Sequence, residues 1–218
     1  IFPKKGEIHF AGALENNEDT GTLQYLASTA MEAGFSTRVL DMQALDLQNG
    51  RFFDPAGELV NRCFKLYPWE WMVDESPDGC LAEMEWLEPI WKLVMSNKAI
   101  LATLYELFPD SPYVLPCYLS RPRSGLFCKK PVFSREGHNV SVVDIRDWEE
   151  YVRIAETEGD YNTGAYVYQE YVEPTAYSGR YPVIGSWIIG GEAAGIGIRE
   201  NRMEVTDNLS EFVPHIIG

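Results

Sequence analysis

The 218-residue chain is acidic and moderately apolar, with 33 aspartate and glutamate residues against 18 lysine and arginine residues and a formal net charge of -15. This charge repels nucleic-acid phosphates and anionic lipid, so we expect neither nucleic acid nor a membrane as a partner. The chain has no run of about 18 apolar residues and no signal-peptide layout, from which we expect no membrane insertion, no secretion and a cytoplasmic location.

The N-terminal stretch predicts a strand, a helix and a second strand. Residues 8–14 are apolar and typical of a strand, and the polar residues 16–19 can cap a helix. Apolar residues then recur at helical spacing until Gly34, namely Leu23, Leu26, Ala27 and Ala30. Residues 37–40 predict the second strand, so we expect a βαβ unit with parallel strands.

The middle of the chain predicts a hairpin and then helix. Phe52 and Phe53 precede the turn sequence of residues 54–57, and a strand is expected near residues 60–66. Residues 83–108 have a helical pattern that is broken at Pro89, and Ser96 with Asn97 can cap its second part.

The chain after Pro112 predicts strands, most of them antiparallel. The expected strands are residues 113–119, 126–133, 140–145, 165–172, 182–189, 193–198 and 203–205. We therefore expect a mixed α/β (α+β) fold, with a βαβ portion at residues 1–75 that belongs to a substrate region and a mainly antiparallel, nucleotide-binding portion at residues 76–218.

A local cluster of cations stands out in this acidic chain. Lys129, Lys130 and Arg135 lie in or beside the polar loop of residues 134–139, which joins two of the expected strands and contains Gly137. Backbone N–H groups around a glycine can bind phosphate oxygens, and nearby cations add charge-assisted contacts. The loop indicates a nucleotide-phosphate site, although a solvated hairpin tip with flanking lysines has the same pattern.

Two further segments could complete such a site. The strand end QEYV, residues 169–172, could read an adenine edge with its backbone, or it could be an ordinary strand of a sheet core. The hairpin of residues 185–201 turns at Gly190 and Gly191 and ends in Arg199, Glu200 and Asn201. An arginine beside a carboxylate suits phosphoryl transfer, and a surface ion pair is the alternative.

Six segments, in order over nearly the whole chain, resemble the glutathionylspermidine synthase-like family of ATP-grasp ligases. They are FKLYPWEWM (64–72), EPIWK (88–92), SNKAIL (96–101), KKPVFSREGHNV (129–140), GSWIIGGEAAGIGIREN (185–201) and FVPHII (212–217). The resemblance implies an ATP-grasp fold, ATP and Mg²⁺ as cofactors, and the joining of a small-molecule carboxylate to an amine through an acyl phosphate. Glutathione and a polyamine are one candidate pair of substrates, which the resemblance alone does not settle.

The resemblance also implies roles for individual residues. Lys98 and Lys130 match two lysines that hold ATP phosphates, and Arg199 matches an arginine that assists phosphoryl transfer. The remaining residues implied at the nucleotide are Glu136 and Gly137 in the loop over the phosphates, Gln169, Glu170, Tyr171 and Val172 in the adenine-binding linker, and Glu204, Val205 and Thr206 beside the nucleotide.

The chain also departs from the family pattern. The carboxylate and asparagine ligands that hold magnesium in the family are expected upstream of Ile1, so the metal ligands here are unassigned and we expect this piece alone to be inactive. The sequence REN at residues 199–201 replaces the more usual RED, which leaves the role of an acid at position 201 open. A nucleotide- or small-molecule-binding protein with an ATP-grasp cleft and no ligase activity is the alternative function, but Lys98, Lys130 and Arg199 together favour the enzyme.

Other features predict structural roles. Trp69, Trp71, Trp86 and Trp91 could stack on a ligand, but aromatic packing against helices is the favoured interpretation. His215 is expected to be a structural histidine rather than a base, and the acidic run of residues 15–19 a helix cap rather than a polyamine site. The four cysteines form no CxxC pair and predict reduced, structural thiols.

Overall fold

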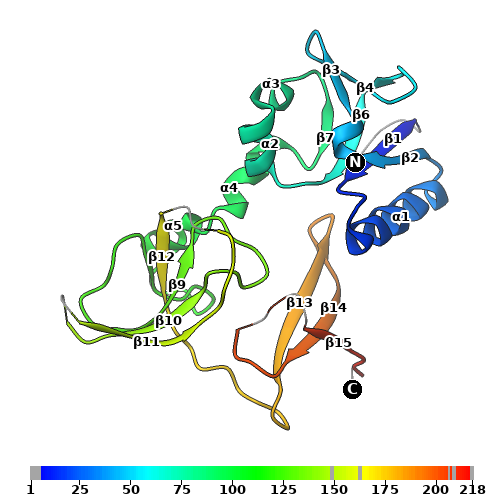
Figure 1. Cartoon of the computed structure of the whole chain (residues 1–218). Coiled ribbons are helices and arrows are strands. Elements are labelled where there is room, and N and C mark those ends of the chain that lie inside the picture. The colour runs from blue at the N-terminus through cyan, green and yellow to red at the C-terminus, as the bar shows by residue number, and fades with distance from the viewer. Residues whose placement is uncertain (1–5, 148–149, 162–163, 206, 208–209, 217–218) are drawn as a thin grey trace. The chain divides into compact units, whose positions relative to one another are not determined.

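The computed structural model describes residues 6–147, 150–161, 164–205, 207 and 210–216. Its contacts divide the chain into two compact units, Ile1–Met95 and Ser96–Gly218 (Figure 1). The sequence predicts a boundary between residues 75 and 76 instead. The first unit extends beyond that point because strand β7 (Glu85–Leu87) pairs with β6 (Arg62–Leu66) in its sheet. No helix in the described ranges is both long and apolar enough to cross a membrane.

The first unit is built on a parallel sheet in the strand order β2-β1-β6-β7. Strands β1 (Glu7–Gly12) and β2 (Ser36–Asp41) pair in parallel and are connected by helix α1 (Asn17–Glu32), which confirms the predicted βαβ unit. The helix begins at a side-chain cap, because the side-chain oxygen of Asn16 accepts a hydrogen bond from the backbone N–H of Glu18 at 2.9 Å. Capping therefore accounts for the polar run that precedes the helix.

A small antiparallel sheet confirms the predicted hairpin only in part. It contains β3 (Asp46–Gln48), β4 (Arg51–Phe53) and β5 (Leu59–Val60), and β4 pairs with β5 across the turn. The single strand predicted over residues 60–66 is wrong, because β6 leaves this hairpin and pairs with β1 instead. Cys63 and Lys65 of β6 are buried in the parallel sheet, which explains the change of partner.

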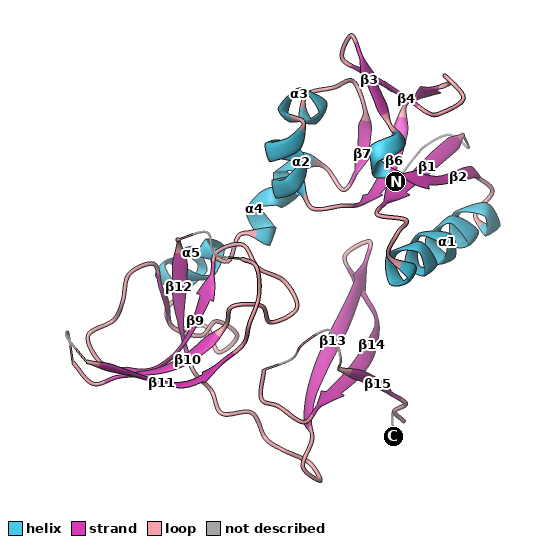
Figure 2. Cartoon of the chain, viewed as in Figure 1, coloured by secondary structure: helices cyan, strands magenta, loops and turns pink. Residues whose placement is uncertain are grey.

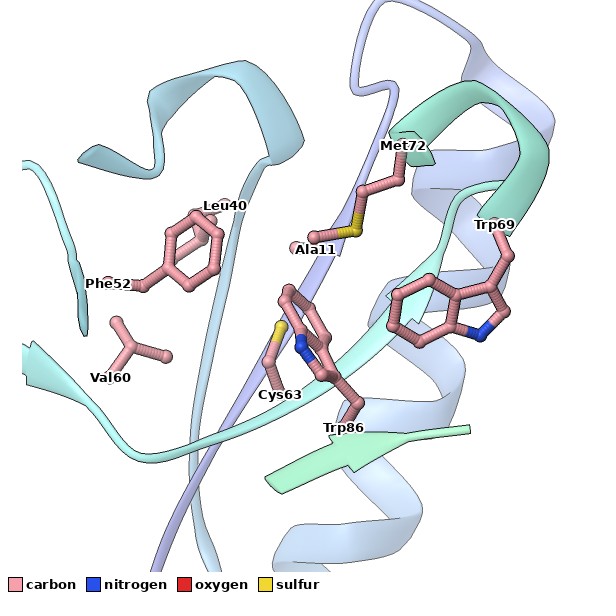
Figure 3. Close-up of a cluster of buried hydrophobic side chains, with 8 residues drawn as sticks. All are labelled: Ala11, Leu40, Phe52, Val60, Cys63, Trp69, Met72 and Trp86. Carbon is pink, nitrogen blue, oxygen red and sulfur yellow. The ribbon is translucent and has the colours of Figure 1, made fainter. Parts of the chain in front are cut away.

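Figure 3 shows the main core of the first unit, where Trp69, Trp86, Phe52 and Met72 converge. The Trp69 and Trp86 rings meet edge to face with their centroids 5.7 Å apart. Trp86 lies on β7, which pairs with β6, so the helix predicted from residue 83 is wrong in its first part. Four tryptophans were predicted to pack within the protein. Trp69 and Trp86 are buried there as predicted, whereas Trp71 and Trp91 are 42% and 59% exposed.

The helical segments around this core are short. They are the 3₁₀ helices η1 (Met42–Ala44) and η2 (Ile90–Lys92) and the α-helices α2 (Trp69–Glu75), α3 (Pro77–Cys80) and α4 (Leu93–Ser96). Helix α3 begins with a proline, which is well suited to a first helical position because its missing N–H would have no partner there.

Lys65 is a cation inside this unit, with only 8% of its surface exposed. Its Nζ donates a hydrogen bond to the carbonyl oxygen of Tyr67 at 2.6 Å and lies 3.9 Å from the centre of the Trp69 ring. Burial lowers the pKa of Lys65 to about 8, because weakly polar surroundings disfavour the charged ammonium. Keeping this ammonium charged at neutral pH therefore opposes folding.

Replacing this lysine should stabilise the protein. The unfolded chain holds the Lys65 proton up to its ordinary pKa of 10.5 and the folded chain only up to about 8, so the contribution of Lys65 to the unfolding free energy rises with pH between these values. We expect Lys65→Met to raise the free energy of unfolding at pH 7 by about 1–2 kcal/mol, and this advantage to shrink as the pH approaches 10. Urea titrations of both proteins at several pH values measure the difference, and an advantage that is constant with pH would contradict this account.

The second unit contains a five-stranded antiparallel sheet in the order β11-β10-β9-β12-β8 (Figure 2). Its strands are β8 (Cys117–Tyr118), β9 (Gly125–Pro131), β10 (Ser141–Ile145), β11 (Tyr151–Glu156) and β12 (Tyr166–Glu170). Helix α5 (Ala99–Leu107) contacts β8 and β12, and Asn97 accepts a hydrogen bond from the backbone N–H of Ala99, as predicted for a cap. The strand predicted over residues 113–119 is reduced to β8, and β11 was not predicted.

A separate three-stranded antiparallel sheet follows, in the order β13-β14-β15. Strands β13 (Tyr181–Ile189) and β14 (Glu192–Asn201) form the predicted hairpin, with positive φ angles of 60° and 87° at Gly190 and Gly191 in its turn. The third strand is β15 (Glu211–Val213), whereas residues 203–205, predicted as a strand, form a bend. The side chain of Asn201 explains this bend, because its amide binds the carbonyl oxygen of Val205 and closes the segment locally.

Candidate functional site

One face of the five-stranded sheet carries most of the chemistry predicted from the sequence. Cys128 of β9 lies directly opposite Gln169 of β12, and residues opposed in this way share a face of the sheet. Lys130 follows two residues after Cys128 and therefore lies on the same face. Lys129 lies on the other face, where its Nζ is 3.9 Å from the centre of the Tyr166 ring. Of the two adjacent lysines in the sequence, only Lys130 faces the site.

A cavity of about 400 Å³ covers this face. Every residue that the sequence predicts to hold a cofactor and that the structure describes lines it, namely Lys98, Lys130, Glu136, Gly137, Gln169, Glu170, Tyr171, Val172, Glu204 and Val205. Thr206, predicted with them, lies outside the described residues. Segments that are distant in the sequence thus meet at one cavity within the second unit.

The two lysines of the cavity are held by uncharged oxygen atoms. Lys98 Nζ donates to the carbonyl oxygen of Ser134 at 2.5 Å and lies 3.0 Å from its Oγ. Lys130 Nζ donates to Oε1 of Gln169 at 2.8 Å. The backbone N–H of Lys98 also binds the carbonyl oxygen of Val132, which joins the start of the helical segment to the end of β9. Both ammonium groups are therefore positioned from separate elements of the fold.

The loop of residues 134–139 forms a tight turn beside these lysines. Glu136 and Gly137 have φ angles of 52° and 74°, and the backbone N–H of His138 binds the carbonyl oxygen of Arg135 at 2.8 Å. This N–H is thus already used within the turn. Since Glu136 and Gly137 line the cavity, the turn has the position that the sequence predicts for a phosphate loop, and its role as such stays a prediction.

The loop is fastened to the segment that follows β11. The hydroxyl of Thr157 donates to the carbonyl oxygen of Gly137 and accepts from the backbone N–H of Val140. The backbone N–H of Tyr161 donates to Oδ1 of Asn139 at 2.7 Å. Gly159 approaches so closely that an added Cβ would lie 2.4 Å from the Cβ of His138. These contacts hold the loop in place without any ligand.

The remaining wall of the cavity is apolar and was not predicted from the sequence. Leu115, Cys128, Val140, Val142 and Pro174 contribute to it. For Cys128 and Val142 the signal was the alternation of residues along β9 and β10, which reveals their common face only after the strands are paired. Burial raises the pKa of the Cys128 thiol, so this side chain is neutral at physiological pH. A cavity lined both by cations and by apolar side chains suits a ligand that has a flat apolar part and an anionic part.

A hydrogen bond connects the end of β12 to the bend after β14. The hydroxyl of Tyr171 donates to the Glu204 carboxylate at 2.5 Å, and both residues line the cavity. Burial and this hydrogen bond raise the pKa of the Tyr171 phenol. The contact therefore joins the linker to the segment predicted beside the nucleotide.

A second cavity of about 620 Å³ shares Glu136, Gly137, Glu204 and Val205 with the first. Its lining also contains the acidic residues Glu156, Glu158 and Asp207 and one arginine, Arg202. The two cavities thus meet at the Glu136–Gly137 turn and at the bend that contains Glu204 and Val205.

Arg199, predicted to act in catalysis, does not line either of these two cavities. It lies on β14 opposite Val183 and Phe212, and its guanidinium carbon is 5.8 Å from the centre of the Phe212 ring. Asn201, two residues further, shares its face and is paired with Tyr181, which lines the second cavity. Arg199 therefore lies on the same sheet face as Tyr181, a residue that lines the second cavity.

Two other sequence expectations concern metals and thiols. No group of three or more histidine, cysteine, aspartate or glutamate side chains within the described ranges could hold a metal ion, so the metal ligands stay unassigned. Cys63, Cys80, Cys117 and Cys128 are free thiols, as the sequence predicts.

The solved structure of D-cycloserine synthetase superposes with a TM-score of 0.53 over 89% of this chain and 68% of that chain, at 14% sequence identity. A likeness at this identity concerns the fold alone. The mixed α/β fold is of the ATP-grasp type, as the sequence predicts.

The chain belongs to the family described as glutathionylspermidine synthase pre-ATP-grasp, whose model matches residues 2–218. A putative acid–amine ligase of Haemophilus influenzae is 34% identical over 97% of this chain and 56% of its own length. The trypanothione synthetase of Crithidia fasciculata is 28% identical over 95% of this chain and 35% of its own length. The chain thus spans about half of the first relative and about a third of the second.

Proposed function

We propose that this chain is the nucleotide-binding part of an ATP-dependent acid–amine ligase. The observation that carries the proposal is the cavity whose lining combines Lys98 and Lys130 with the aliphatic side chains of Leu115, Val140 and Val142. Cations of this kind bind phosphate oxygens strongly, and an aliphatic slot suits a purine ring. Family membership supports the same activity, since the relatives that match are named as ligases and synthetases.

In the proposed reaction a carboxylate oxygen of the acid attacks the terminal phosphorus of ATP, and the bond from that phosphorus to ADP breaks. The amine nitrogen then attacks the carbonyl carbon of the acyl phosphate, loses a proton, and displaces inorganic phosphate to form the amide. Lys98 and Lys130 would hold the phosphates, and the Glu136–Gly137 turn would cover them. A magnesium ion would neutralise phosphate charge in such a reaction, and its protein ligands are not assigned. Glutathione and a polyamine are a candidate pair of substrates, which the family description suggests.

Arg199 is proposed to stabilise the charge that develops on the transferred phosphoryl group. Its position on the sheet face beside the second cavity supports this role only in part, because neither of the two cavities includes it in the lining. This observation favours a second candidate function, a nucleotide-binding protein that retains the cleft without ligase chemistry.

Calorimetric titration tests the nucleotide site. The 218-residue chain should bind ATP weakly but measurably, and more tightly than AMP, because the additional phosphates reach the two lysines. An affinity for ATP that is no higher than that for AMP would contradict the proposed site.

Turnover separates the two candidate functions. In the full-length protein, a ligase releases ADP only when both a carboxylate and an amine are present, and a binding protein releases none with any pair. The same assay on residues 1–218 tests the prediction that this piece alone is inactive, which magnesium-dependent ADP release would contradict.

A further inference from the structure

The ammonium group of Lys130 binds a neutral side chain, although the chain is rich in carboxylates. Arg38, Arg51, Arg62, Arg153 and Arg180 each pair with a carboxylate. Among the described residues, Lys130 instead makes no ion pair and binds the side-chain amide of Gln169 at 2.8 Å. Carboxylates are nevertheless present near Lys130, because Glu136, Glu170 and Glu204 line the same cavity.

An amide oxygen and a carboxylate do different things to an ammonium group. Both fix its position, but the carboxylate also cancels its charge, whereas the amide leaves the full charge available to a third group. A phosphate that approaches Lys130 therefore meets an ammonium that is already in place and not neutralised.

The position of Gln169 in the sheet lets its side-chain amide hold the Lys130 ammonium group. Gln169 lies between Cys117 of β8 and Cys128 of β9, directly opposite both. The neighbouring backbone N–H groups of Glu170 and Tyr171 donate to the carbonyl oxygens of Pro116 and Leu126 at 2.8 and 3.0 Å. Burial raises the pKa of both flanking thiols and keeps them uncharged, and the hydrogen bond of the Gln169 amide oxygen goes to the ammonium group of Lys130.

We propose that Gln169 is a positioning residue for Lys130, which holds its ammonium ready for the nucleotide phosphates, and that its side chain does not read the base. This inference rests on the proposed nucleotide site. It assigns the side chain of Gln169 to the phosphate end of the cavity, while the backbone of the same segment remains available to the base.

The test uses four probes with wild-type protein, Gln169→Leu and Gln169→Glu: ATP, AMP, adenosine and inorganic tripolyphosphate. Gln169→Leu keeps the size of the side chain and removes the acceptor, and it should weaken ATP and tripolyphosphate by about 10-fold while adenosine changes by less than about 2-fold. Gln169→Glu places a carboxylate against Lys130 and should weaken the same two probes further, again without changing adenosine. This second variant carries the test if Gln169→Leu does not fold.

A double-mutant cycle separates positioning from a general structural role. In a Lys130→Ala background, Gln169→Leu should no longer affect tripolyphosphate binding, because the group that it positions is absent. Thermal unfolding of each variant identifies losses that arise from stability alone.

Two results would overturn this role. An equal loss of ATP and adenosine affinity in Gln169→Leu would show that the side chain reads the base. A loss of tripolyphosphate affinity from Gln169→Leu that is as large in the Lys130→Ala background as in the wild-type protein would show that Gln169 does not act through Lys130. A wild-type chain that binds neither ATP nor tripolyphosphate would contradict the proposed function itself. The two failures are thus distinguishable.

Discussion

Lys98→Ala and Lys130→Ala are each expected to weaken ATP binding by about 1.5–3 kcal/mol, a factor of roughly 10–150 in the dissociation constant. The reason is geometric: the two ammonium groups come from separate elements and line one cavity, and each would give a charge-assisted hydrogen bond to a phosphate oxygen. Calorimetry with ATP measures both losses directly.

Lys129→Ala is the matched control, since it removes the same charge from the neighbouring position. Its ammonium lies on the other face of the sheet over Tyr166, so ATP affinity should change by less than about 0.5 kcal/mol. Equal losses in Lys129→Ala and Lys130→Ala would point to a diffuse charge effect rather than a phosphate site. Unchanged affinity in both Lys98→Ala and Lys130→Ala would exclude the site altogether.

Arg199→Ala is expected to lower kcat of the full-length protein by about 10²–10³ with little change in KM for ATP. A guanidinium that acts on the transferred phosphoryl group contributes most where charge develops, while the cavity lysines hold the nucleotide in the ground state. Arg199→Lys keeps the charge without the planar fork and should recover only part of the rate. Steady-state kinetics of the three proteins supply these values.

Arg146→Ala serves as the control for the loss of an arginine, because Arg146 pairs with Asp144 and Glu150 on the surface and should not affect turnover. A steep rise in KM for ATP with unchanged kcat would make Arg199 a binding residue. Unchanged kcat and KM would show that Arg199 takes no part in the reaction, consistent with its absence from the lining of the two cavities.

Local patterns predicted the elements whose determinants are local. The βαβ unit follows from apolar spacing and the Asn16 cap, and the β13–β14 hairpin from Gly190 and Gly191. Strand β7 was not predictable in this way, because Trp86 makes it a strand through contacts with Phe52 and Trp69 across the core. A helical spacing of apolar residues was overridden there by tertiary packing.

The candidate site, like the fold, was predicted only in part from the sequence. The resemblance gave the lysines, the turn and the linker, and the cavity brings these residues together. It did not give Ser134, a loop residue that holds Lys98, or the amide that holds Lys130, which depends on the side chains that face one another across β9 and β12. The strand pairing that determines these faces involves residues about 40 positions apart, beyond the reach of any local pattern.

The opposite orientations of Lys129 and Lys130 make the site sensitive to the alignment of a single strand. If β9 slipped by one residue against β12, every side chain of β9 would change faces: Lys129 would enter the cavity, and Lys130 would move to the aromatic side beside Tyr166. The net charge and the composition would be unchanged, yet the ammonium would lose its amide partner. An inserted or deleted residue in β9 should therefore harm ligand binding more than many substitutions within it, and the length of this strand is itself a determinant of the chemistry.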